Sequence, residues 1–137
     1  MSARIQDKIF EIENYLEELS GILPVAFSQY SSDLKAKAAC ERYFEKIVEA
    51  VVDLAFLVIR EKSLRTPEED REAFDILCNA KIIDFSLAVR LKEAKGMRNF
   101  LAHQYGAIDN ALVFMALKHE LQKDVRKFLE AIEKSMR

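Results

Sequence analysis

The chain has 137 residues, the length of one domain, and 50% of them are hydrophobic, so we expect a folded chain and not a disordered one. The 21 basic and 23 acidic side chains give a net charge of −2, which argues against a general nucleic-acid coat protein, because such proteins are strongly basic. Three glycines and two prolines are few for the turns of a sheet fold. The composition therefore favours a single all-α domain over residues 1–137.

Hydrophobic periodicity predicts the first two long helices. The first runs from about Ala3 to Leu23, where the helical spacing of isoleucines and leucines is interrupted by Pro24. A short aromatic segment over residues 25–31 can be helix or loop. The run Ser31-Ser32-Asp33 then offers N-cap chemistry for a long helix over about residues 33–62. That helix is apolar almost all round in its second half, so it is expected to be buried on more than one side.

Three further helices follow in the second half of the chain. Thr66 is predicted to cap a third helix that has Pro67 at its first position. A fourth helix is predicted over about residues 84–103, and Asp109 is predicted to cap a last helix over about residues 110–134. With short connections and no internal repeat, the sum is an antiparallel bundle of four to five helices.

Several features argue against membrane, metal and secreted classes. Cys40 and Cys78 stand apart with no nearby ligand pattern, so neither a metal site nor a disulfide can be argued from them. The longest apolar run, residues 47–59, contains two acidic side chains and is too short to span a bilayer. The chain opens on alternating charged and apolar residues, unlike a signal peptide. We expect a cytoplasmic protein without membrane contact, metal or cofactor.

The fourth predicted helix carries the candidate site at its C-terminal end. His103 is one of only two histidines, and imidazole is the side chain whose ordinary pKa lies nearest neutrality, which suits proton transfer. Arg98 carries a planar fork of donors that matches phosphate. Arg98 and His103 are therefore the candidate catalytic residues, and Lys95 belongs with Arg98 to a small basic patch that could bind an anionic substrate.

The spacing of the two catalytic candidates raises a geometric difficulty. Residues five apart on an ideal helix lie about 140° apart around its axis, so Arg98 and His103 do not share a stripe. A site that uses both needs the long arginine to reach round, or groups from a second copy of the chain. The simpler alternative is a surface histidine together with cations, Lys92 and Lys95 included, that pair with the helix terminus. His119 is interpreted as a surface histidine.

An acidic stripe in the long second helix supplies one supporting candidate. Glu41, Glu45, Glu49 and Asp53 are spaced four apart, and the first two are interpreted as a solvated face. Asp53 lies among apolar residues, where a carboxylate needs a cation or several donors. We therefore expect Asp53 to lie near the motif and to orient its arginine or its histidine.

The chain resembles HEPN-domain proteins of the HepT type, the toxin half of MNT/HepT toxin–antitoxin systems. The resemblance covers nearly the full length and rests on the order of the helices and on the run Ala-Val-Val-Asp-Leu-Ala over residues 50–55. It rests above all on Arg-Asn-Phe-Leu-Ala-His-Gln-Tyr from Arg98 to Tyr105, which matches the family's Arg-x4-His-x-Tyr motif in full.

The resemblance implies a metal-independent endoribonuclease that acts as a homodimer, with the two motifs facing each other across the dimer cleft. His103 would serve as general acid or base on the 2′-hydroxyl or on the leaving oxygen, and Arg98 would neutralise the charge that develops on the phosphate. Asn99 would bind the substrate phosphate or hold His103, and Tyr105 would position the substrate. The resemblance also implies an antitoxin partner, an MNT-type minimal nucleotidyltransferase that transfers AMP to the motif tyrosine, here Tyr105.

Two other interpretations of the same residues stay open. In the first, the chain is a non-catalytic subunit of a nucleotidyltransferase that binds nucleotide or substrate, with Arg98, Lys92 and Lys95 holding a phosphate. In the second, it is a purely structural dimerisation bundle, in which Arg98 and His103 are indifferent to substitution.

Overall fold

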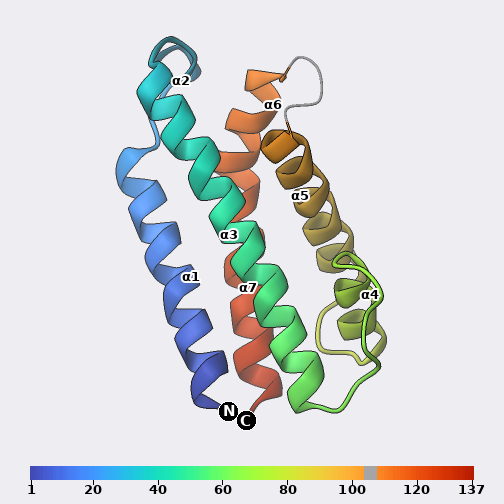
Figure 1. Ribbon diagram of the computed structural model, residues 1–137. Coiled ribbons are helices and arrows are strands. Elements are labelled where there is room, and N and C mark those ends of the chain that lie inside the picture. Colours follow the sequence, from blue (N-terminus) through green and yellow to red (C-terminus); the bar gives the residue numbers. More distant parts are fainter. Residues whose placement is uncertain (104–107) are drawn as a thin grey trace.

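The protein is an all-α bundle in the computed structural model, which describes residues 1–103 and 108–137. Within those residues the elements are helices only: α1 (Ala3–Ile22), α2 (Phe27–Ser32), α3 (Leu34–Glu61), α4 (Glu72–Asn79), α5 (Phe85–His103), α6 (Asn110–Met115), the π-helix η1 (Ala116–Glu120) and α7 (Leu121–Ser135). The long stretches α1, α3, α5 and α6–α7 run alternately up and down, so the two termini lie side by side at one end (Figure 1). The predicted antiparallel bundle is confirmed.

Aspartate caps fix the beginnings of the later long helices. Asp33 Oδ1 accepts two backbone N–H groups at 3.1 Å at the start of α3, and Asp84 Oδ1 accepts one at 2.7 Å at the start of α5. Asp109 does the same for α6 at 3.0 and 3.2 Å. Each carboxylate satisfies N–H groups that have no partner inside the first turn. The predicted starts of these three helices are confirmed, and the ambiguous segment after α1 is the short helix α2.

The predicted start of the third helix is wrong. The capping role assigned to Thr66 would require its hydroxyl to accept an N–H two or three residues on, yet the N–H of Glu68 donates to the carboxylate of Glu72 at 3.1 Å. Arg65 binds the same carboxylate at 2.6 Å. Glu72 thus ties the connecting segment to α4, which begins only at Glu72.

The last predicted helix is interrupted by a wider turn. The π-helix η1 separates α6 from α7, and π turns of this length shift the register of everything that follows. In that register the buried Asp124 of α7 accepts a hydrogen bond from Arg90 Nε of α5 at 2.7 Å. His119 lies exposed within η1, as the sequence predicts.

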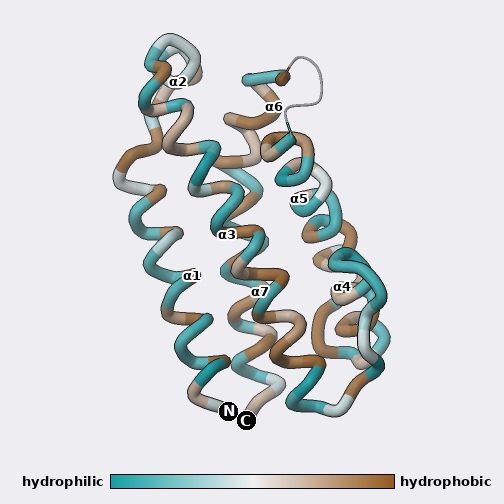
Figure 2. Tube along the Cα trace, viewed as in Figure 1, coloured by the Kyte–Doolittle hydropathy of each residue, from teal (hydrophilic) through white to brown (hydrophobic). Residues whose placement is uncertain are grey.

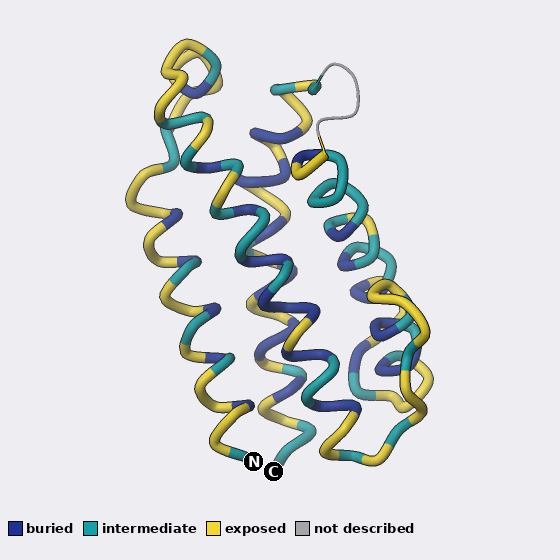
Figure 3. The backbone as a smooth tube through the Cα atoms, viewed as in Figure 1, coloured by how far each residue is buried: buried dark blue, intermediate teal, exposed yellow. Residues whose placement is uncertain are grey.

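The long helix α3 is the spine of the core. It packs against α1, α4, α5 and α7, and its buried residues run from Cys40 to Ile59. Apolar positions gather along the inward sides of the helices (Figure 2), and the same sides are buried (Figure 3). The largest fully buried side chains are aromatic: Tyr30, Phe44, Phe74 and Phe128. Within residues 1–103 and 108–137 no helix has the length and apolar character needed to cross a membrane.

Candidate functional site

The site is built on α5, which is fixed by buried apolar residues along its length. Leu87, Ala88, Leu91 and Leu101 lie in the core, and α5 packs against α3, α4 and α7. Three cations of the same helix, Lys92, Lys95 and Arg98, are spaced three apart, so they follow one another along a neighbouring stripe. Each pairs with a carboxylate from another segment: Lys92 with Asp75 of α4 at 2.8 Å, Lys95 with Asp70 at 3.2 Å, and Arg98 with Glu49 of α3.

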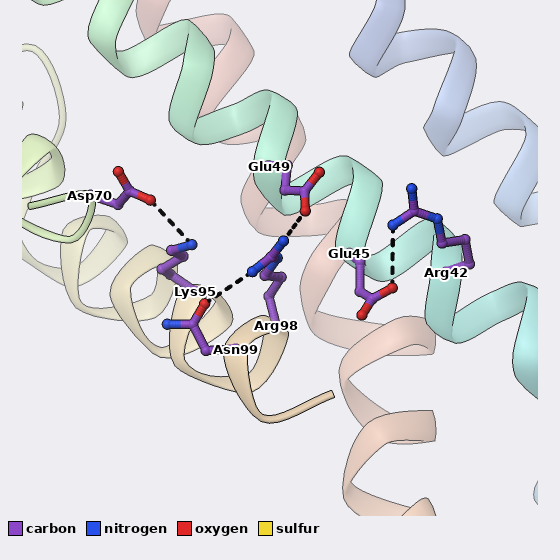
Figure 4. Close-up of polar contacts among 7 residues, drawn as sticks. All are labelled: Arg42, Glu45, Glu49, Asp70, Lys95, Arg98 and Asn99. Atoms are coloured by element: carbon purple, nitrogen blue, oxygen red, sulfur yellow. Dashed lines mark hydrogen bonds and ion pairs between the residues drawn. The ribbon is translucent and has the colours of Figure 1, made fainter. Parts of the chain in front are cut away.

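The guanidinium of Arg98 is held by acceptors on two helices (Figure 4). Its Nη2 donates to a carboxylate oxygen of Glu49, and its Nη1 donates to Oδ1 of Asn99 at 3.3 Å. Its Nε is buried and has no partner among the described residues. The Arg98 side chain is 20% exposed, so the charge lies in a partly dehydrated setting where it acts more strongly than in bulk water.

Among the described residues, Glu49 and not Asp53 is the carboxylate that contacts the motif arginine, Arg98. Asp53 is 63% exposed in its side chain and forms an ion pair with Lys8 of α1 at 3.6 Å. The expected role of Asp53 in orienting the motif arginine is therefore corrected: Glu49, one turn earlier in the same acidic stripe, contacts Arg98. The sequence shows the acidic stripe, but which of its carboxylates faces Arg98 depends on how α3 packs on α5.

Lys95 differs from its prediction as a substrate-binding cation. It is only 8% exposed and pairs with Asp70, which lies in the segment that connects α3 to α4 (Figure 4). The carboxylates described above also neutralise Lys92 and Arg98, so the three cations do not form an open basic patch. Lys95 holds the connecting segment against α5 instead.

His103 is the last residue of α5, and its side chain is exposed to solvent. It lies five residues beyond Arg98, whose side chain points toward α3 (Figure 4). Tyr105 and the predicted helix break at Gly106 lie outside the described residues, so their place in the site stays a prediction. Among residues 1–103 and 108–137, no group of three or more His, Cys, Asp or Glu side chains is arranged to hold a metal ion.

The fold and the motif define a helical-bundle protein of the HEPN class, and comparison with known proteins gives the family. Residues 12–132 match the model of the family described as Ribonuclease HepT-like, so the chain belongs to that family. The match spans every element from the middle of α1 to the last turns of α7.

Named relatives and a solved structure agree with this assignment. The chain is 26% identical to the mRNA nuclease HepT of Shewanella oneidensis over 106 residues, which cover 77% of this chain and 79% of that protein. It is 28% identical to the tRNA nuclease HepT of Aphanizomenon flos-aquae over 119 residues, which cover 87% of this chain and 81% of that protein. The structure of the tri-AMPylated Shewanella oneidensis HEPN toxin in complex with MNT antitoxin superposes with a TM-score of 0.91 at 25% identity, covering 98% of this chain and 99% of that chain.

Proposed function

We propose that this protein is a metal-independent endoribonuclease, the toxin of a toxin–antitoxin pair, and that its substrate is cellular RNA in the cytoplasm. The observation that carries the proposal is the held arginine of the family motif. Glu49 and Asn99 fix the guanidinium of Arg98 in a partly dehydrated site, and His103 follows at the exposed end of the same helix. Preorganised positive charge of this kind stabilises the charge that develops during phosphoryl transfer.

RNA supplies its own nucleophile, so the chemistry requires no metal. His103 removes the proton of the 2′-hydroxyl or protonates the leaving 5′-oxygen, a role that contributes about 10²–10⁴ in rate. The 2′-oxygen forms a bond to phosphorus, the bond from phosphorus to the 5′-oxygen breaks, and the 5′-oxygen gains a proton. The products are a 2′,3′-cyclic phosphate and a 5′-hydroxyl. Arg98 neutralises the phosphorane-like charge, and Asn99 helps to orient the guanidinium of Arg98.

The site is completed by a second copy of the chain. Since Arg98 and His103 lie about 140° apart around an ideal helix, one chain has difficulty presenting both to one phosphate. In a homodimer with facing motifs, the arginine of one chain and the histidine of the other reach the same phosphate. This arrangement also explains why His103 is exposed in the single chain.

The proposed regulation is addition of AMP to Tyr105 by an MNT-type nucleotidyltransferase antitoxin. Support comes from the solved structure of the similar Shewanella oneidensis HEPN toxin, which is tri-AMPylated and in complex with MNT antitoxin. On this chain an added AMP would place a bulky anion two residues from His103. RNA would then be excluded by steric overlap and by repulsion of its phosphates.

The test compares the two histidines. Purified wild-type protein, His103→Ala and His119→Gln are incubated with an RNA substrate in excess EDTA. We expect the wild type and His119→Gln to cut equally and His103→Ala to lose activity, because only His103 belongs to the motif. Equal cleavage by all three preparations, or none by any of them with Tyr105 unmodified by mass spectrometry, would contradict the proposal.

A further inference from the structure

A hollow of about 910 Å³ lies next to the motif arginine and extends away from it. Arg98 and Lys95 of α5 line it, together with residues of α3, the first turns of α1 and the segment that connects α3 to α4. Because α3 runs antiparallel to α5, residues that follow Glu49 on α3 lie progressively farther from His103. Arg60 comes eleven residues after Glu49, which is about 16 Å along the helix axis.

One face of α3 forms the floor of this hollow. Glu49, Asp53, Phe56 and Arg60 all line it, and their spacing of three or four residues places them on one continuous stripe. Phe56 is half-buried and lies between Glu49, the acidic residue beside Arg98, and Arg60 at the far end. The floor therefore combines polar positions with one aromatic ring, as surfaces that bind single-stranded nucleic acid do.

The charge of the hollow is opposite in sign to that of the whole chain. Its described lining holds five cationic side chains, Arg4, Lys8, Arg60, Lys95 and Arg98, against the carboxylates of Glu49, Asp53 and Asp70. All three carboxylates already pair with cations of the same set. The side chains of Arg4 and Arg60 are exposed and form no ion pair or hydrogen bond with any described residue. An excess of positive charge thus lies in a protein whose net charge is −2.

We propose that this hollow binds the stretch of RNA that flanks the cleaved phosphate, with Arg4 and Arg60 contacting backbone phosphates and Phe56 offering its ring to a base. The inference rests on the proposed nuclease function and names the part of the substrate site that lies beyond Arg98. The volume lies near the upper end of the range for ligand pockets, about 300–1,000 Å³, so it has room for more than one nucleotide.

A second copy of the chain fits this surface less well than RNA does. In a two-fold dimer the same patch lies on both sides of the interface, so a patch at its centre meets itself. The unpaired arginines would then face a surface that also carries an excess of positive charge. A phosphate backbone brings the opposite charge and needs no partner residues.

The test measures how RNA binding depends on salt. The ligand is a 2′-O-methyl oligonucleotide, which lacks the nucleophile and is not cut. Its affinity for the full chain is measured over a series of salt concentrations for wild type, for Arg4→Gln/Arg60→Gln, and for Lys123→Gln/Arg126→Gln. The last pair is a matched control, because both residues are exposed on α7 and lie outside the hollow.

Each phosphate contact to a single strand contributes about 0.7 to the slope of log K against log salt, so the Arg4/Arg60 variant should have a slope that is shallower by about 1.4. Its affinity should fall alike for all sequences, and the control should match the wild type. Equal slopes for the two double variants would overturn the inference. So would a change in oligomeric state by light scattering that is confined to Arg4→Gln/Arg60→Gln, since the hollow would then be a subunit interface.

Failure of the proposed function gives a different result. Suppose that the wild type and the control cut ordinary RNA in EDTA while both double variants have equal slopes of log K against log salt. The nuclease function would then stand, and only the role of the hollow in binding RNA would be rejected. A wild type that neither cuts nor binds RNA would reject both the nuclease function and the role of the hollow.

Discussion

Arg98 is a partly buried cation beside the apolar face of α5, and its contacts show how such a charge is stabilised there. An arginine that is only 20% exposed requires a partner, because a buried charge without one is costly. Glu49 provides the opposite charge and Asn99 a neutral acceptor, so the two acceptors set the plane of the guanidinium. Glu49 is a positioning residue in this account, since it acts on the phosphate through Arg98.

Replacement of Glu49 tests that role. Glu49→Ala should lower kcat/KM for RNA by about 10- to 100-fold, because a guanidinium displaced by about 1 Å loses much of its effect on the transition state. Glu49→Gln keeps one acceptor oxygen and should lose less. The measurement is steady-state cleavage of an RNA oligonucleotide, with thermal unfolding followed in parallel to separate positioning from folding.

Glu45→Gln provides the matched control for this experiment. Glu45 lies one turn earlier in the same acidic stripe and pairs with the exposed Arg42 at 3.4 Å, whereas Glu49 pairs with Arg98 (Figure 4). Cleavage by this variant should equal that of the wild type. The positioning role is lost if Glu49→Ala cuts as fast as Glu45→Gln.

At the scale of the elements, α4 shows how a side chain that reaches back along the chain decides where a helix begins. The N–H of Glu68 and the guanidinium of Arg65 both donate to Glu72, and they hold the pKa of its carboxyl below the ordinary value of 4.5. A carboxyl whose pKa is lowered by folding stabilises the folded state above its unfolded pKa. That stabilisation is lost as the pH falls through the folded pKa.

The difference in stability between wild type and Glu72→Gln should therefore depend on pH. At pH 7 the wild type should unfold at a higher urea concentration than the variant, and the gap should stay constant down to about pH 5. Below that it should close as Glu72 takes up a proton. A gap that stays unchanged down to pH 3 would show that the charge of Glu72 contributes nothing to this connection.

The sequence predicts those features of the elements that depend on neighbouring residues. Asp33, Asp84 and Asp109 bond N–H groups only two or three residues on, so the approximate starts of these helices can be predicted from the sequence. The late start of α4 and the π turn of η1 are not visible in the sequence. The first depends on a carboxylate several residues further on, and the second adds one residue to a turn without breaking the apolar pattern.

The candidate site follows the same division. Arg98, Asn99 and His103 are recognisable from their spacing and from the motif that they share with a family. Glu49 is not, because its choice over Asp53 depends on the angle at which α3 crosses α5. Lys95 has the residue type of a phosphate ligand, but tertiary packing buries it against Asp70.

At the scale of the whole molecule, the account requires two chains for one site. Arg98→Ala and His103→Ala proteins with different tags can be co-expressed and their mixed dimer purified. Each variant alone should be inactive, and the mixed dimer should regain a share of wild-type cleavage, because one of its two sites combines an intact arginine with an intact histidine. An inactive mixed dimer, or a wild type that is monomeric by light scattering, would contradict the shared site.

The central claim is that this motif cuts RNA through the 2′-hydroxyl of the RNA itself. The most direct test compares one RNA oligonucleotide with a chimera that carries a single 2′-deoxynucleotide at the cleaved position. Both are incubated with wild-type protein in excess EDTA, and the products are identified by mass spectrometry. The account predicts a 2′,3′-cyclic phosphate and a 5′-hydroxyl from the RNA and no cut at the deoxy position of the chimera. Cleavage of the chimera at that position, or products with a 3′-hydroxyl and a 5′-phosphate, would contradict it.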